Sequence, residues 1–213
     1  MRLFAAVWPP EHVLDHLDVA LGAVRGAPSG LSQAVRWSAR ETWHLTTAFY
    51  GDLPDGSLPA LAAGLAELAA RVEPYELTLR GAGVFSHRTL WIGVGGDVET
   101  QRVVSSGCVD AGDVPDRRAR ERAHLTVGRV RPGSRPPRRG SSTNTRGRPG
   151  PEPDREVEVA DGIVRALAVY EGPRWEVGEI LLMSSQPGAG RGGGPLYEVV
   201  EQFALASRGR MGT

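Results

Sequence analysis

The sequence of 213 residues contains no lysine and one cysteine, Cys108. One thiol cannot form a disulfide within the chain or build a cysteine-based zinc cluster, which predicts a protein of a reducing compartment. Without lysine, the glycine-rich stretch 188–194 cannot complete a lysine-containing phosphate loop, and a turn is predicted there. No apolar run is long enough to cross a bilayer, and segment 1–8 is too short for a signal peptide. We therefore predict a cytoplasmic globular protein with no membrane partner.

The charges balance over the whole chain, but their distribution is uneven. All 25 basic residues are arginine, and 25 acidic residues bring the net charge to zero. Twelve of the arginines lie in 117–155, together with only three acids. Such a stretch can attract a polyanion, yet its content of proline, glycine and serine favours a solvated loop. Residues 131–156 are accordingly predicted to be a disordered Arg/Pro-rich insertion.

Hydrophobic periodicity predicts that strands alternate with helices. Apolar residues at helical spacing predict four helices, over residues 9–25, 58–72, 98–111 and 157–170. Strand-like runs occupy residues 2–8, 35–37, 43–50, 76–85, 89–94, 123–130, 175–184 and 196–204. Run 43–50 precedes a helix and two strands, and run 123–130 precedes the insertion, a helix and two strands. This repeated order predicts two similar lobes.

One tripeptide occurs twice, as His44-Leu45-Thr46 and His124-Leu125-Thr126, and uses two of the five histidines in the chain. Side chains alternate along a strand, so the histidine and threonine of each copy should share a face. Two histidines near neutral pKa can act as a proton acceptor and a proton donor. Threonine hydroxyls can donate to the non-bridging oxygens of a phosphate as negative charge develops. The four residues are therefore predicted to open a strained phosphodiester without a metal or other cofactor.

Segments on both sides of the tripeptides carry a family resemblance. They are residues 2–7, 35–37, 43–51, Phe85, 88–94, 124–129 and 194–197. Together they resemble the bacterial and archaeal RNA 2′,3′-cyclic phosphodiesterases, which belong to the two-histidine phosphoesterase superfamily and are often named 2′-5′ RNA ligases. The resemblance implies an α+β, bilobal fold: two pseudo-symmetric lobes of antiparallel sheet with outer helices and a central cleft. It further implies that 1–213 is a single domain.

The resemblance also implies roles for individual residues. His44 matches the proton donor, His124 the proton acceptor, and Thr46 and Thr126 the residues that hold the phosphate. Arg129 matches an arginine that can contact phosphate, although strict alternation from His124 would turn it to the opposite face of the strand. The family usually has proline directly before the second histidine, with an aromatic residue ahead of it. This chain has alanine and arginine there, at positions 123 and 122.

The implied function is hydrolysis of RNA 2′,3′-cyclic phosphate ends to 2′-phosphomonoesters. RNA ends would be the partner, and a monomer without a required protein partner would be the active form. Two alternatives remain from the sequence: 2′-5′ ligation by the same site, and a non-catalytic RNA- or nucleotide-binding domain. His12 and His16, four residues apart on a predicted helix, are interpreted as a surface pair because no third metal ligand accompanies them. Cys108 is interpreted as a small buried residue.

Overall fold

The computed structural model of the chain describes residues 1–26, 31–113, 122–132 and 155–206. The predicted insertion 131–156 therefore lies almost entirely outside the described residues. The strands and helices in chain order are β1 (Arg2–Val7), α1 (Glu11–Arg25), β2 (Val35–Trp37), β3 (Leu45–Asp52), α2 (Leu58–Ala69), β4 (Tyr75–Phe85), β5 (Thr89–Gly96), α3 (Val98–Ala111), β6 (His124–Val130), α4 (Arg155–Ala166), β7 (Glu171–Val177), β8 (Glu179–Gln186) and β9 (Leu196–Ala204). No helix in these ranges is long and apolar enough to cross a membrane.

Most predicted elements form within a few residues of their expected bounds. One prediction is wrong: the run 175–184 is two strands, β7 and β8, with Gly178 between them. The run reads as one strand because apolar residues lie on both sides of Gly178, but β7 pairs with β4 whereas β8 pairs with β1 and β9. The chain thus leaves one half of the sheet and enters the other at Gly178. Helix α4 also begins and ends earlier than expected.

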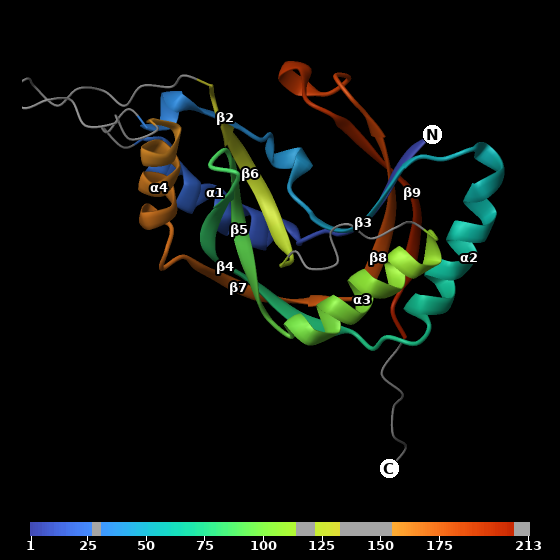
Figure 1. The fold of residues 1–213 in the computed structure, drawn as a ribbon. Helices are drawn as coiled ribbons and strands as arrows, with labels where there is room; N and C mark the ends of the chain where they lie inside the picture. Colours follow the sequence, from blue (N-terminus) through green and yellow to red (C-terminus); the bar gives the residue numbers. More distant parts are fainter. Residues whose placement is uncertain (27–30, 114–121, 133–154, 207–213) are drawn as a thin grey trace, which may run out of the picture.

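The strands form one antiparallel sheet. It consists of two halves of four strands each, and the tripeptide strand is the innermost strand of each half. The order is β7-β4-β5-β6-β3-β1-β8-β9, and β2 adds to β6. The two strands that carry the tripeptides, β3 and β6, therefore lie side by side in the middle. Figure 1 shows α1 and α4 beside the β4–β7 half and α2 and α3 beside the β8–β9 half, as their contacts confirm. The predicted α+β class with two pseudo-symmetric halves is confirmed.

The sheet has two different faces. In β1, Leu3 and Ala5 belong to the main hydrophobic core, which the helices also enter. The residue between them, Phe4, instead joins a second and smaller cluster with Leu181 and Met183 of β8. This division follows from strand alternation, which sends successive side chains to opposite sides. We call the side that carries Phe4, Leu181 and Met183 the open face.

The register at the centre of the sheet depends on a single residue pair. Leu45 of β3 pairs with Leu125 of β6, and both side chains are fully buried in the main core. Burial of each leucine stabilises the fold by about 2 kcal/mol. A slip of one residue would move both leucines onto the open face and expose them, so burial fixes the pairing.

Candidate active site

The Leu45–Leu125 pair brings the two tripeptides together around a local two-fold axis. In an antiparallel pair with this register, His44 lies beside Thr126 and Thr46 lies beside His124. All four side chains project to the open face, because the two leucines occupy the core face. The histidines therefore stand on one diagonal of a four-residue cluster and the threonines on the other. Within one copy, Nε2 of His44 is 3.1 Å from Oγ1 of Thr46.

Both imidazole rings are held in the same way by the backbone. Nδ1 of His44 lies 2.8 Å from the carbonyl oxygen of Thr42, and Nδ1 of His124 lies 2.9 Å from that of Arg122. A carbonyl oxygen only accepts, so each Nδ1 carries a hydrogen and donates it. In the neutral ring, Nε2 then presents its lone pair to the open face. The unusual residue types at 122 and 123 leave this bond intact, because only the backbone of Arg122 takes part.

A β-bulge follows the threonine of each tripeptide. In β6 the extra residue is Val127, which falls between the residues that pair with Leu90 and Trp91 of β5. In β3 the extra residue is Thr47, at the same place in the other copy. Both extra residues are buried, Val127 with 1% and Thr47 with 7% of its surface exposed. The repeat therefore extends beyond the tripeptides to a shared backbone irregularity.

The bulge at Val127 decides where Arg129 points. Strict alternation from His124 would place Arg129 on the core face, and this expectation is wrong. Arg129 pairs with Thr89, which lies on the same face of β5 as Trp91, and Trp91 pairs with the threonine of the second tripeptide. A bulge adds one residue and so reverses the alternation beyond it. Arg129 consequently shares the open face with His124.

Aromatic side chains enclose His44. Its ring stacks on Trp8 with 5.4 Å between centroids, and contacts Phe4 at 4.9 Å and Tyr197 at 5.2 Å. Burial lowers the pKa of His44 to about 4; the hydrogen bond to Thr42 opposes this shift, whereas the nearby His124 adds to it. At pH 7 the ring of His44 is therefore neutral.

The surroundings of His124 are more open. Its ring meets Phe85 edge-on at 4.8 Å and lies 6.2 Å from Trp91. The residue paired with His124 on β5 is Gly93, which contributes no side chain. On β4, Gly83 pairs with Trp91, and a Cβ there would lie 2.1 Å from the indole. Glycine at this position is thus required for the indole of Trp91 to lie against the strand.

Two further arginines lie near the site and were not among the residues predicted for it. Arg2 stacks on the ring of Phe49 at 5.1 Å. Arg36 pairs with Arg129 across β2 and β6, and its guanidinium donates to the carbonyl oxygen of Gly192 at 3.0 Å. Strand alternation in β1 could have pointed to Arg2, because it places Arg2 on the open face. The position of Arg36 near the site could not be predicted in this way, because it depends on the pairing of β2 with β6.

Tyr197 connects these arginines to the histidine pair. Burial raises the pKa of Tyr197, and the positive charges of Arg129 and Arg2 oppose that shift, so both lie near its hydroxyl. The same tyrosine ring contacts His44 edge-on. Positive charge from both halves of the sheet is thus placed beside the two imidazoles, where an anion would be attracted.

The other histidines and the cysteine lie apart from this cluster. Nδ1 of His16 is 3.3 Å from the hydroxyl of Tyr170, and His12 is exposed on the same helix. His87 lies in the β4–β5 turn at a φ of 56°. Cys108 is buried, and burial raises the pKa of its thiol to about 12. Within 1–26, 31–113, 122–132 and 155–206, no three His, Cys, Asp or Glu side chains gather closely enough to hold a metal ion.

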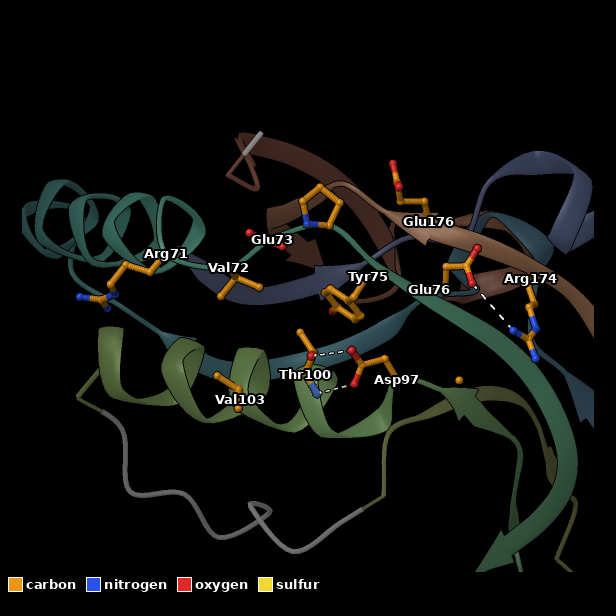
Figure 2. Close-up of a pocket in the computed structure, with 12 residues that line it drawn as sticks. Arg71, Val72, Glu73, Tyr75, Glu76, Asp97, Thr100, Val103, Arg174 and Glu176 are labelled. Carbon is orange, nitrogen blue, oxygen red and sulfur yellow. Dashed lines mark hydrogen bonds and ion pairs between the residues drawn. The ribbon is translucent and has the colours of Figure 1, made fainter. Parts of the chain in front are cut away.

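A cavity of about 850 Å³ lies away from the tripeptides, between the start of β4, the first turn of α3 and β7 (Figure 2). Four of its polar residues form two pairs. The carboxylate of Asp97 accepts from the backbone nitrogen of Thr100 at 3.0 Å and from its hydroxyl at 2.7 Å. Arg174 is 3.8 Å from Glu76. The cavity therefore presents helix-capping and surface ion-pair chemistry, and none of the predicted site residues lines it.

Comparison with known proteins gives consistent matches. A family model described as LigT-like phosphoesterase matches residues 7–93. The RNA 2′,3′-cyclic phosphodiesterase of Methanothermobacter thermautotrophicus is 31% identical over 138 residues, which cover 62% of this chain and 72% of that protein. The RNA 2′,3′-cyclic phosphodiesterase of Geobacillus stearothermophilus is 36% identical over 107 residues, 47% of this chain. That match spans only 34% of the Geobacillus protein.

Solved structures share the fold at lower identity. TT0787 of Thermus thermophilus superposes with a TM-score of 0.65 at 23% identity, covering 98% of this chain and all (100%) of that one. Escherichia coli LigT complexed with 3′-AMP gives a TM-score of 0.59 at 22% identity, covering 96% of each chain. LigT complexed with phosphate gives 0.59 at 21% identity, covering 96% of this chain and 97% of that one. The arrangement of strands and helices is therefore common to all of them.

Proposed function

This chain belongs to the LigT-like phosphoesterase family, and from that premise we propose that it hydrolyses 2′,3′-cyclic phosphate ends of RNA to 2′-phosphomonoesters. The observation that carries the proposal is the diagonal placement of two histidines and two threonines about the Leu45–Leu125 pair. In-line displacement at phosphorus needs an acid and a base on opposite sides of the phosphate, and this diagonal supplies them. The names of the two curated relatives support the same reaction.

The two threonines, which form the other diagonal of the cluster, would bind the cyclic phosphate. The hydroxyls of Thr46 and Thr126 donate to the two non-bridging oxygens, as charge on these oxygens grows in the transition state. Arg129 adds positive charge from the open face, where the bulge directs it. All of these groups come from one chain, and we propose the monomer as the active unit with an RNA end as its partner.

The chemical step moves two protons. Nε2 of His124 accepts a proton from water as the water oxygen bonds to phosphorus. The bond between phosphorus and the 3′ oxygen breaks, and Nε2 of His44 gives a proton to that oxygen. The product is a 2′-phosphomonoester with a free 3′ hydroxyl. The step leaves His44 neutral and His124 protonated, and proton exchange with water restores the starting state.

The low pKa of His44 sets a condition on this step. Because its ring is neutral at pH 7, a proton must arrive before His44 can act as the donor. The cyclic phosphate is an anion, and an anion beside an imidazole stabilises the charged ring. Substrate binding is therefore coupled to protonation of His44. An acid whose pKa burial has lowered also donates its proton readily.

The test compares His44→Ala, His124→Ala and the surface variant His12→Ala on an oligonucleotide that ends in a 2′,3′-cyclic phosphate. We expect each site variant to lose at least about 100-fold in kcat/KM, the usual range for a general acid or base. His12→Ala should match the wild type. Phosphorus NMR identifies the product, and addition of a chelator should leave the rate unchanged. Full activity in either site variant, a 3′-phosphate or ligated product, or loss of activity with chelator would contradict the proposal.

A further inference from the structure

An arginine on β4 shares a cross-strand row with His124. Arg80 pairs with Gly93 of β5, and Gly93 pairs with His124 of β6. Paired residues in a sheet project to the same face, so Arg80 and His124 both lie on the open face. They are two strand spacings apart, or about 10 Å. The residue in the middle of the row is glycine, and the indole of Trp91 lies beside it, 3.4 Å from where a Cβ of Gly93 would stand.

The floor beside this row is made of backbone. Gly95 follows on the same face of β5, and a Cβ there would come within 2.4 Å of the Cδ of Arg80. The aliphatic part of Arg80 thus extends over Gly95. At the other end of the row, Trp91 and Phe85 flank His124. Gly93 and Gly95 thus form a strip on the open face next to His124, which we call the glycine strip; aromatic rings lie at one edge of it and a guanidinium at the other.

Arg80 is available to a ligand. It is exposed, and within the described ranges it forms neither an ion pair nor a side-chain hydrogen bond. Its pairing partner on the edge strand β7 is the acid Glu171, on the side away from His124. The guanidinium therefore has room for an anion on the side of the glycine strip.

The corresponding row in the other half of the sheet is closed. His44 lies next to Trp8, and continuing the β1–β8 register places Glu179 opposite Trp8. Trp8 and Glu179 also line one cavity. A bulky indole thus occupies the position of Gly93, and a carboxylate occupies the position of Arg80. A polyanion leaving the site would be repelled on the His44 side and attracted on the His124 side.

We propose that Arg80 binds the phosphodiester one nucleotide upstream of the cyclic phosphate, with the RNA chain running over the glycine strip. This inference rests on the proposed function, and it names the substrate class more closely as oligonucleotide ends in preference to mononucleotides. The terminal cyclic phosphate lies between the two histidines. The next backbone phosphate, on the 5′ side, reaches the guanidinium of Arg80.

The experiment measures kcat/KM for a trinucleotide ending in a 2′,3′-cyclic phosphate and for the matching nucleoside 2′,3′-cyclic phosphate. The variants are Arg80→Gln, Arg80→Lys and the control Arg102→Gln, which changes an exposed arginine on α3. We expect Arg80→Gln to lower the trinucleotide-to-mononucleotide ratio about 10-fold, the value for one charge-assisted contact. Arg80→Lys should recover part of that loss. Arg102→Gln should keep the wild-type ratio.

Salt gives an independent readout. Removal of one phosphate contact should reduce the slope of log(1/KM) against log[salt] by about 0.7 for the trinucleotide. An unchanged ratio in Arg80→Gln, or an equal loss on both substrates, would overturn the proposal. Wild-type protein that hydrolyses neither substrate would overturn the proposed function itself. Wild-type protein that hydrolyses both equally well would overturn only the assignment of Arg80.

Discussion

The two halves of the open face share a backbone plan and differ in their walls. Each supplies a histidine held by a carbonyl two residues upstream, a threonine two residues downstream, and a bulge directly after that threonine. Around His44 the wall is aromatic and closed, whereas around His124 it contains glycine and is open. The same backbone arrangement thus occurs in two different environments. The environment of a side chain determines its acid-base properties.

The difference is visible position by position. The fifth residue after the first histidine is Phe49, on which Arg2 stacks, and the fifth after the second is Arg129. Trp8 in one half corresponds to Gly93 in the other. The closed half lowers the pKa of its imidazole, and the open half is the side on which we propose that substrate enters. The two tripeptides are therefore equal in sequence and unequal in their surroundings.

A change of leaving group should have the largest effect, because it tests directly whether His44 is the proton donor and His124 the proton acceptor. A 2′,3′-cyclic substrate in which sulfur replaces the 3′ oxygen releases a thiol, whose pKa of about 8.5 makes protonation far less necessary. We expect His44→Ala to regain most of its 100-fold or greater loss on this substrate, because the donor is no longer required. His124→Ala should remain inactive on it. Rescue of His124→Ala instead would interchange the two roles.

The pH dependence of stability is the next largest effect. The pKa of His44 falls from 6.5 to about 4 on folding, so between these values the unfolded chain binds the proton more readily. The free energy of unfolding should therefore decrease as pH falls from 6.5 to 4, by at most about 3 kcal/mol from this group. Urea unfolding at pH 7 and pH 4.5 measures the loss.

The variant His44→Gln isolates the contribution of His44 to this pH dependence, because glutamine does not take up a proton in this range. It should lose less stability than the wild type over the same interval. His12→Gln, on the exposed surface of α1, serves as the matched control and should follow the wild type. Equal losses in wild type and His44→Gln would show that the closed half does not hold the ring neutral.

The smallest expected effect comes from opening the closed wall. Trp8→Ala removes the indole stacked on His44 and admits water, so the pKa of His44 should rise toward 6.5. NMR titration of the His44 ring measures the shift. Trp91→Ala, which removes an indole from the other half, should leave the pKa of His44 in place. A shift of the same size in both variants would argue against separate environments.

The sequence predicted the parts of the site that depend on local pattern. Strand alternation correctly placed each histidine with its threonine, and the helical and strand periods located most elements. It could not place Arg129, because a bulge is a property of the register between β5 and β6 and has no periodic signal. It also merged β7 and β8, because apolar residues occur on both sides of Gly178 and the change of pairing partner there has no local signal.

The pairing between the two halves of the sheet could not be predicted from local pattern either. That Leu45 pairs with Leu125 follows from burial of both leucines on one side of a shared sheet, which requires residues 80 positions apart to meet. The role of Arg36 depends on β2 joining β6, another long-range contact. Both are results of tertiary packing, which single-strand preferences do not encode.

The pair Leu45–Leu125 has a consequence for how a substrate is oriented. A cyclic phosphodiester has two bridging and two non-bridging oxygens around phosphorus, so the reacting group is itself close to two-fold symmetric. Seated on the axis through the leucine pair, it would fit the four side chains equally well in two orientations that exchange the 2′ and 3′ oxygens. The four residues alone cannot choose between the isomeric products. On the proposed path of the RNA, the choice would belong to the unequal walls, with Trp8 and Glu179 excluding the chain and Gly93 and Arg80 receiving it.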